Sequence, residues 1–495
     1  MMKRQAVIWS CMSLVAFAFL WGQEQTDPPS RVARLDFVAG AVSFRQASVD
    51  EWATATLNYP LTTGDHLWTD QGARANVHVG STAVRLADQT NLALLNLDDQ
   101  TAQVGLTQGI INVHIKNLDS DQTFEVDTPN SAVSLLLPGD YRIDVDLDST
   151  ATAVIVRVGD AEVTGGGQAF AVHSRQFCRF SGTDQVAAET LAVPAPDPWD
   201  QWCMSRDEGE DRALQASARY VSQEMTGAED LAQYGEWRND ASYGAIWMPT
   251  QVVAGWEPYR YGRWAYAEPW GWTWIDDAPW GFAPFHYGRW AMIGARWAWV
   301  PGAVVARPIY APALVAFIGG SGFSLAIGGG SVAAWVPLGP REVYHPSYRV
   351  SEAYVRNVNI PHVRNISNIN AVNVTYVNQT HVTAVRHNDF TGARSVAAAA
   401  IRIPPSAIAR AQTVTALNIP PARESRMGQT VRPGVRVVAP PTRVMNREVT
   451  VKQAPPEMSR RIPVRIAPPA SINRQQQRDT TQPPPRNMQP PPRTV

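Results

Sequence analysis

The sequence predicts a mainly β protein, and two patterns support this prediction. Short runs of alternating apolar and polar residues, separated by Gly-containing turns, fill residues 32–182. Further along, a Tyr-Gly-x-Trp motif occurs three times at spacings of 27 and 26 residues, between segments rich in the turn formers Gly and Pro. We therefore expect a β domain followed by a β-hairpin repeat domain, joined by a short helical linker.

The N-terminal residues 1–22 have the pattern of a secretory signal. Lys3 and Arg4 precede 16 apolar residues that carry no charge. A membrane-spanning helix needs about 20 apolar residues, so this stretch is short for a span. An uncleaved inner-membrane anchor stays open as an alternative, since no Ala-x-Ala cleavage site is evident near Gly22. We expect an exported protein that resides in the periplasm, at the outer membrane or outside the cell.

Residues 32–182 contain repeated strand and turn patterns of the all-β type. The segments with the most distinctive spacing are Gly40-Ala-Val42, Pro60-Leu61 before Gly64-Asp65-x-Leu67, Phe124-x-Val126-x-Thr128-Pro129, Gly139-Asp140-Tyr-Arg-Ile143 and Gly159-x-Ala161-x-Val163. Together they resemble the FecR-like extracytoplasmic domain of bacterial envelope proteins. That resemblance implies a β-rich, non-catalytic fold.

Membrane regulators of the FecR type carry a cytoplasmic domain that contacts a sigma factor. Only five residues precede the apolar stretch here, so we expect no direct contact with a sigma factor.

The linker, residues 183–233, contains a charged, Ala-rich segment, Asp207 to Tyr220, whose apolar residues fall on one helical face. Removal of the signal would leave two cysteines, Cys178 and Cys203. An even pair in an exported chain favours one disulfide, which would close a loop of about 25 residues and stabilise the fold by about 3 kcal/mol. The alternative is two buried free thiols.

Residues 234–354 form the predicted Trp-rich repeat domain, which holds 11 of the 18 tryptophans within 63 residues. The predicted framework consists of Tyr234 and Trp237, Tyr261 and Trp264, and Tyr287 and Trp290. Each unit is expected to be a short hairpin. With Pro269-Trp-Gly-Trp-Thr-Trp274 and Ala334-Trp-Val-Pro-Leu-Gly-Pro340, the pattern resembles an uncharacterised Trp-rich family of secreted Gram-negative proteins. Glycine-separated apolar runs at 313–318, 323–327 and 332–336 predict buried strands.

The tryptophans allow two interpretations. Crowded indoles can form the core of a small repeat module, which we expect for Trp264 and Trp290. Exposed indoles can instead stack on the sugar rings of a glycan. Trp270, Trp272 and Trp274 alternate with period two, so they should share one strand face, and we expect them to be partly exposed and to bind. Arg263 and Arg289, at matching motif positions, could stack on indoles or contact anionic groups.

The C-terminal part of the chain is basic. Residues 1–340 hold 21 Lys and Arg against 37 Asp and Glu, whereas residues 341–495 hold 22 against 7. Residues 355–399 are rich in Asn and Val and allow no structural prediction, whereas residues 400–495 contain 18 of the 38 prolines and predict a disordered tail. Its partners would be envelope polysaccharide or another anionic polymer, or other envelope proteins, rather than nucleic acid. Docking on the acidic front half is the competing expectation.

No enzyme motif is evident in the sequence, so we predict no catalytic residues, no cofactor and no metal site. The adjacent carboxylates Asp276 and Asp277 would point to opposite faces of a strand, whereas glycoside hydrolysis needs both beside one bond. The predicted function is that of a non-enzymatic envelope protein, structural or adhesive, that binds polymer through exposed aromatics. Two alternatives remain open: an extracytoplasmic sensor that binds a small ligand or an envelope protein, and a glycan-active enzyme with an unrecognised site.

Overall fold

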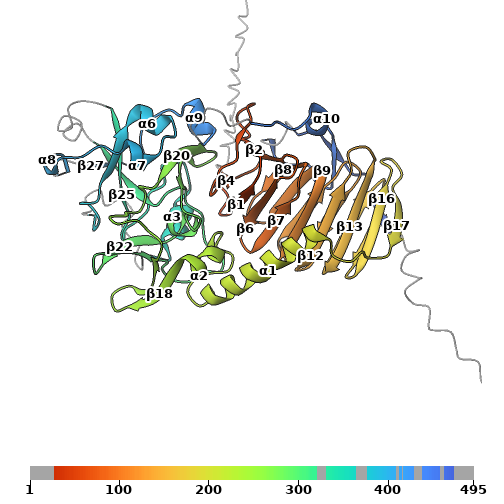
Figure 1. Ribbon diagram of the computed structural model, residues 1–495, viewed down its shortest axis with the longest axis horizontal. Coiled ribbons are helices and arrows are strands. Elements are labelled where there is room, and N and C mark those ends of the chain that lie inside the picture. The colour runs from red at the N-terminus through yellow and green to blue at the C-terminus, as the bar shows by residue number, and fades with distance from the viewer. Residues whose placement is uncertain are drawn as a thin grey trace, which may run out of the picture.

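The computed structural model describes residues 27–319, 331–363, 376–408, 412–414, 416–428, 437–457 and 462–472. The predicted signal, residues 1–22, and the predicted strand at 323–327 lie outside these residues. The fold is mainly β, as the sequence predicts. Figure 1 shows a long stack of strands, residues 33–191, beside a more irregular second domain that contains the Trp-rich hairpins. No helix in these described ranges has the length and apolar character needed to cross a bilayer.

The first domain consists of two sheets that share one strand. Sheet A contains, in spatial order, β4 (Pro60–Leu61), β1 (Ala33–Ala39), β6 (Arg74–Val79), β7 (Thr82–Leu86), β9 (Thr101–Ile115), β12 (Gly139–Val145), β13 (Ala151–Val158), β16 (Gln176–Ser181) and β17 (Ala187–Leu191). Sheet B contains β3 (Ala53–Thr54), β2 (Val42–Arg45), β5 (His66–Thr69), β8 (Thr90–Leu97), β9, β10 (Thr123–Asp127), β11 (Ala132–Leu135), β14 (Asp160–Gly165), β15 (Gln168–His173) and the distant β30 (Ser471–Ile472).

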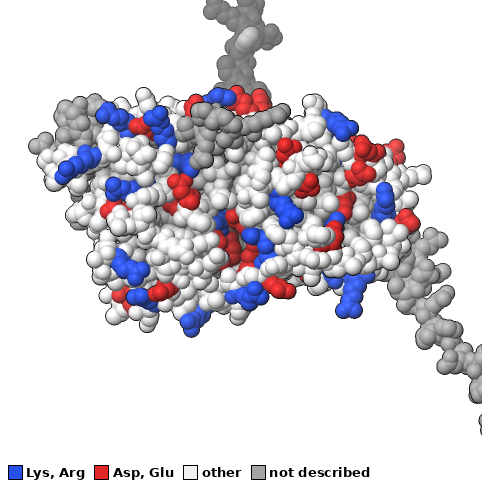
Figure 2. Space-filling view, viewed as in Figure 1, with Lys and Arg blue, Asp and Glu red and all other residues white. Residues whose placement is uncertain are grey.

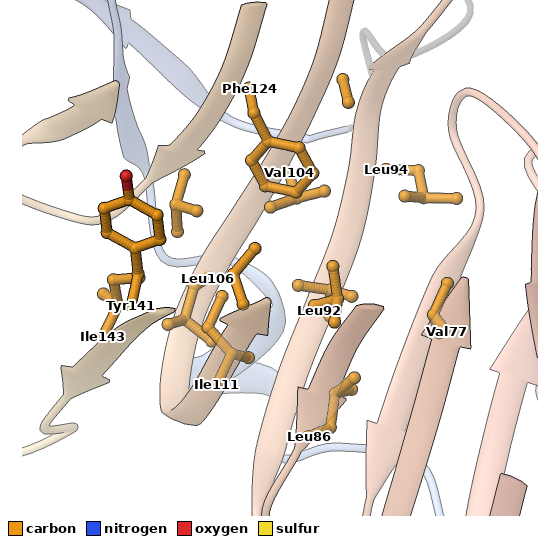
Figure 3. Packing of buried hydrophobic residues seen from close by; sticks show 14 of the residues in the cluster. Val77, Leu86, Leu92, Leu94, Val104, Leu106, Ile111, Phe124, Tyr141 and Ile143 are labelled. Atoms are coloured by element: carbon orange, nitrogen blue, oxygen red, sulfur yellow. The ribbon is translucent and has the colours of Figure 1, made fainter. Parts of the chain in front are cut away.

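Strand β9 passes from sheet B to sheet A at Gly109. This residue has φ +100°, and a side chain there would overlap Thr90, so the bend requires glycine. Apolar residues from both sheets fill the space between them, as Figure 3 shows for Leu92, Leu106 and Ile111. The alternating pattern in the sequence therefore marks the inward faces of two packed sheets.

Helix α1 (Pro198–Ser217) crosses the outer face of sheet A and leads into the second domain (Figure 1). It is longer than the helix predicted from Asp207 and begins with a capping box that the sequence analysis missed. Asp197 accepts a hydrogen bond from Asp200 N (2.8 Å), the Asp200 side chain accepts one from Asp197 N (3.3 Å), and Pro198 occupies the first turn.

The predicted disulfide is wrong. Cys178 and Cys203 are both free and buried. Cys178 lies on β16 and packs into the core between the sheets, whereas Cys203 lies on α1 and packs with Trp199 of the same helix and Ala87. The two thiols thus belong to different cores, and the alternative of two buried free cysteines is correct.

Each Tyr-Gly-x-Trp unit begins a β-hairpin, as expected. The hairpins are β18–β19 (Gly235–Asp240 and Gly244–Pro249), β20–β21 (Gly262–Ala267 and Gly271–Asp276) and β22–β23 (Arg289–Ile293 and Arg296–Val300). The first and third join into one four-stranded sheet through Trp247 and Trp299.

A second four-stranded sheet of this domain has the order β26 (Thr383–Arg386), β25 (Val332–Pro337), β24 (Val315–Gly319) and β27 (Gln412–Val414). It confirms the predicted strands at 313–318 and 332–336. The short helices of the domain are η1 (Ala228–Asp230), α2 (Leu231–Tyr234), α3 (Ala283–His286), α5 (Glu352–Asn359), α6 (His387–Thr391), α7 (Val396–Ala399) and α8 (Pro405–Ile408). Part of the segment 355–399, for which the sequence allowed no prediction, thus supplies α6, α7 and strand β26.

The expectation of a disordered tail from residue 400 is wrong for the segments that the structure describes. Helix α9 (Arg423–Arg426) lies on β20, and α10 (Thr442–Met445) lies near β9. Strands β28 (Val449–Val451) and β29 (Val464–Ile466) pair with each other against sheet B, where Val449, Val451 and Ile462 bury Ala93 and Leu95. We call residues 437–457 and 462–472 the strap. Residues 473–495 lie outside the described part.

The C-terminal segments and the front half carry complementary charges where they meet, in line with the expectation that the basic tail docks on the acidic front half. The ion pairs between the described C-terminal segments and the front half include Arg423–Glu51, Arg426–Glu268, Arg443–Asp148, Lys452–Glu162 and Arg465–Asp184. In Figure 2, positive and negative side chains are interspersed over the visible face. Apolar contacts at β28 supply the part of the attachment that salt does not screen.

Candidate ligand-binding pocket

The repeat motif has a structural explanation. In each hairpin the Trp of the motif sits directly opposite a second Trp on the returning strand, in the pairs Trp237–Trp247, Trp264–Trp274 and Trp290–Trp299. The motif glycines Gly235, Gly262 and Gly288 leave the space that the second indole fills, since a Cβ at any of them would overlap that ring. The motif therefore encodes a cross-strand tryptophan pair in each hairpin, with its glycine against the ring of the second tryptophan.

The framework residues lie at different depths in this core. Trp264, Trp290 and Tyr287 are buried, whereas Tyr234, Trp237 and Tyr261 are half-buried at its edge. Trp237 stacks on Tyr220, with ring centroids 4.3 Å apart. The interpretation of Trp264 and Trp290 as core residues is confirmed.

The expected exposure of Trp270, Trp272 and Trp274 is wrong. Their exposed fractions are 1%, 7% and 0%. Trp272 donates from Nε1 to the carbonyl of Ile419 at 3.0 Å and packs on Phe390, so segments far along the chain cover this face. These three indoles offer no platform for a sugar ring.

Arg263 and Arg289 occupy matching motif positions but differ in environment. Arg263 is half-buried and donates from Nη2 to Asp277 Oδ1 at 2.6 Å. Arg289 is 1% exposed, and its guanidinium donates to the carbonyls of Glu342 and Gly288 and to Asn359 Oδ1. Neither arginine takes part in a cation–π contact within the described ranges, so the expected stacking on indoles is not found.

A pocket of about 230 Å³ lies beside Arg289. Four separate segments form its walls: the turn after α1 at 220–225, the end of α3 with the start of β22, the loop 301–309, and the end of α5 at 357–362. Its rim carries two exposed apolar side chains, Val304 at 55% and Ile360 at 53%. The lining is therefore largely apolar, with a few polar groups, as is typical of small-molecule sites.

The nitrogen-bearing side chains of the lining include His286, Arg289 and His362. His286 Nδ1 lies 2.8 Å from the Ala311 carbonyl, to which it donates, and its buried Nε2 has no partner in the described part of the chain. Burial lowers the pKa of His286 to about 3. Burial, together with the positive charge of Arg289, also lowers the pKa of His362 well below its usual range. Both imidazoles are neutral at pH 7, so Arg289 is the cation among these three side chains.

Arg289 keeps its charge despite burial. Desolvation lowers its pKa to about 10, against the opposing influence of Tyr259 and Glu342. The Glu342 carboxylate accepts hydrogen bonds from the backbone N–H groups of Gly339 and Val377, both at 2.6 Å. No carboxylate oxygen of a described residue lies within 4.0 Å of the Arg289 guanidinium. Among the described residues, the Arg289 cation therefore has no directly paired anion.

A second pocket, of about 240 Å³, lies beside Trp256 and Trp297. Val253 and Met292 are exposed at its edge, and the buried Nε1 of Trp297 has no partner among the described residues. Both indoles are buried, with exposed fractions of 9% for Trp256 and 5% for Trp297. The sequence analysis did not single out either tryptophan.

Two clusters beneath α1 have side chains that metals can use, with candidate ligand atoms within 4.8 Å of one another. The clusters are Asp36, His78 and Glu210, and His114, Asp140 and Asp207. Arginines already neutralise most of these carboxylates: Arg206 contacts Asp36 at 3.4 Å and Glu210 at 3.0 Å, and Arg85 pairs with Asp207 and Glu210. We assign both clusters to the attachment of α1 to sheet A.

The adjacent carboxylates Asp276 and Asp277 have separate structural roles. Asp276 is buried and accepts hydrogen bonds from Trp274 Nε1 and Ala278 N, both at 3.0 Å. Burial raises its pKa well above the usual range. Asp277 is exposed and pairs with Arg263. The two groups do not flank a common space, as the alternation along a strand predicts.

By its fold the chain is a two-domain, mainly β protein with a Trp-rich hairpin module. Residues 228–342 match the model of a family of unknown function (DUF6600), which spans the three hairpins and strands β24 and β25. No curated protein matches the chain.

Two solved structures are similar in part, and both are crystal structures described as a "putative anti-sigma factor" from Parabacteroides distasonis ATCC 8503. The first is 16% identical, with a TM-score of 0.23, and the match covers 26% of this chain and 60% of that one. The second is 14% identical, also with a TM-score of 0.23, and the match covers 38% of this chain and 99% of that one. The chain thus spans less than two thirds of the first structure, and at this TM-score the likeness supports no conclusion about function.

Proposed function

We propose that the protein is an exported, non-enzymatic binding protein of the cell envelope that takes a small ligand in the pocket beside Arg289. The observation that carries this proposal is the pocket itself, which combines apolar walls with a buried cation and an unpartnered imidazole nitrogen. Such a combination is the default signature of a ligand site. It favours the sensor interpretation over adhesion through exposed tryptophans.

The loop 301–309 gives this pocket a connection to the first domain. Arg307, which lines the pocket, donates to Asp119 (2.7 Å) and to Asp121 (2.7 and 3.0 Å) in the turn between β9 and β10. The carbonyl of Ala306 in the same loop accepts a hydrogen bond from Ser222 Oγ at 2.7 Å. A ligand that displaced this loop would therefore act on contacts with both the turn after α1 and the first domain, as a sensor requires.

Small fragments test whether the pocket binds. Saturation-transfer NMR on the full chain with benzoate, benzamide, hexanoate and hexanamide should show binding of at least one of them. Val304→Trp should fill the mouth and weaken binding at least tenfold, whereas Val158→Trp, an equally exposed valine of the first domain, should leave it unchanged. No detectable binding, or full binding in the Val304→Trp variant, would overturn the proposal.

The groove beside Trp256 and Trp297 supports a second candidate function, the polymer binding that the sequence analysis expected. Two indoles in its wall, a Trp297 Nε1 that has no partner among the described residues, and exposed apolar neighbours suit a sugar ring. A glycan array probed with the full chain should give a signal that Trp297→Leu removes and Trp52→Leu, a half-buried tryptophan of the first domain, retains. Equal loss in both variants would count against this groove.

Export belongs to the proposal because of the basic and apolar pattern at residues 1–22. N-terminal sequencing of protein from fractionated cells should find mature chain beginning near Gln23 in the periplasmic or outer-membrane fraction. Intact Met1 on cytoplasmic protein would contradict export. The proposal includes no catalytic group and no direct sigma-factor contact.

A further inference from the structure

The chemistry of the pocket narrows the class of ligand. Resting on the proposed function, we infer that the ligand is a small monoanion, a carboxylate or a group of similar charge on an apolar body, and that the buried Arg289 binds the anionic end. Three observations lead to this inference: the unpaired charge, the unused hydrogen-bond donors, and the apolar rim.

The unpaired charge is the first observation. A buried ion costs several kcal/mol unless a counter-charge or a full set of hydrogen bonds offsets the lost hydration. Arg289 is 1% exposed and has no carboxylate within 4.0 Å among the described residues, in contrast to Arg34 and Arg85, which are equally buried but pair with carboxylates. An anion in the pocket would give Arg289 the counter-charge that Arg34 and Arg85 already have.

The second observation is the count of donors. A guanidinium carries five N–H groups, and the partners of Arg289 in the described structure are three oxygens, reached from Nε, Nη1 and Nη2. Carboxylates accept from guanidinium through short, charge-assisted bonds that are about twice as strong as neutral ones. The existing bonds hold the group in place, so binding would require little ordering of the side chain.

The rim and the volume define the rest of the ligand. Val304 and Ile360 expose apolar surface at the mouth, which favours an apolar body over a sugar or a polyol. The pocket, at about 230 Å³, lies below the range of roughly 300–1,000 Å³ that is usual for drug-sized ligands. The second arginine of the lining, Arg307, already pairs with Asp119 and Asp121, so the site offers one free positive charge rather than two. This arrangement fits a monoanion.

Matched probes that differ only in charge test the inference. Calorimetric titration of the full chain with benzoate and benzamide, and with hexanoate and hexanamide, should give at least tenfold tighter binding of the anion in each pair. Arg289→Gln should reduce this ratio to about one. The same substitution at the other lining arginine, Arg307→Gln, should leave the ratio unchanged. Urea unfolding of each variant would verify that it is folded.

The outcomes separate the inference from the proposed function. Equal affinity for acid and amide in the unsubstituted protein would overturn the monoanion inference while the pocket would still bind. Loss of the ratio in Arg307→Gln but not in Arg289→Gln would assign the anion to the rim and also overturn it. Absence of binding by all four probes would overturn both. If Arg289→Gln does not fold, the comparison of acid with amide in the unsubstituted protein still tests whether the pocket prefers a monoanion.

Discussion

Trp264 and Trp274 face each other across hairpin β20–β21, with ring centroids 5.7 Å apart and planes inclined by 72°. This edge-to-face geometry is the favoured arrangement of aromatic pairs. Trp264 also contacts Trp335 on the neighbouring sheet at 5.2 Å. The pair thus joins a hairpin of the repeat to strand β25, which explains why one module needs so many tryptophans.

The glycine of the motif should be as important as the tryptophan. A Cβ on Gly262 would overlap the Ile275 carbonyl oxygen and the Trp274 ring, so Gly262→Ala should lower the free energy of unfolding by about 1–3 kcal/mol or more. Gly209, within α1, has open space around it, and Gly209→Ala should raise stability by about 0.5–1 kcal/mol. Urea unfolding followed by Trp fluorescence measures both. Equal effects in the two variants would refute the steric explanation.

The hairpins could be predicted because turns and alternation are local properties. The exposure of the tryptophans could not be predicted. Alternation with period two places Trp272 and Trp274 on one face of the strand, but it does not reveal that Ile419 and Phe390 cover that face. The even number of cysteines likewise contains no information about the side of sheet A on which each one lies. The pocket could not be predicted because four segments that are distant in the sequence form it. The matching motif positions of Arg263 and Arg289 likewise give no sign that the two side chains differ in burial.

The strap also shows how average composition misleads. Over residues 400–495 the proline and arginine content indicates disorder, yet the short run Val449-Thr-Val451 provides enough apolar surface for docking on Ala93 and Leu95. A single strand of this kind is too short to change the composition of the segment. Only the presence of a complementary face on sheet B makes it stable.

Replacing Val451 with Asp should detach the strap without unfolding the first domain. Val451 is fully buried, and an unpaired carboxylate there would cost several kcal/mol, more than a short strand can offset. Trypsin should then cleave after Arg447 and Lys452, which the intact protein protects because Arg447 donates to the carbonyls of Thr107, Asp146 and Ser149. Val437→Asp, at an exposed position, is the control. Rapid cleavage at these sites in the unsubstituted protein would show that the strap is not docked.

The cysteines should be unreactive in the folded protein. Burial raises the pKa of both thiols, that of Cys203 to about 12, so little thiolate is present at pH 7 to react. Alkylation followed by mass spectrometry should find neither thiol modified under native conditions and both modified in denaturant, with or without prior reduction. A thiol that reacts only after reduction would indicate a disulfide and contradict the structure.

The attachment of α1 to sheet A should depend on pH through His78. Its Nε2 lies 3.3 Å from Glu210 Oε2 on the helix and 3.8 Å from Asp36 Oδ2. Burial by itself lowers the pKa of His78, but the charges of Glu229, Asp36 and Glu210 outweigh it and raise the pKa to about 9. Because this value exceeds the 6.5 of an unfolded histidine, the stabilisation is complete below pH 6.5 and is lost as the pH rises through about 9.

We therefore expect the free energy of unfolding to fall between pH 6.5 and pH 9 in the unsubstituted protein and to fall much less in His78→Gln. The matched control is His173→Gln, since His173 also pairs with an aspartate but is 61% exposed. Its pH dependence should match that of the unsubstituted protein, because an exposed pair contributes little. Urea unfolding midpoints measured between pH 6.5 and pH 9 for the three proteins test this expectation. The same slope in all three proteins would mean that His78 is not the proton-binding group that secures α1.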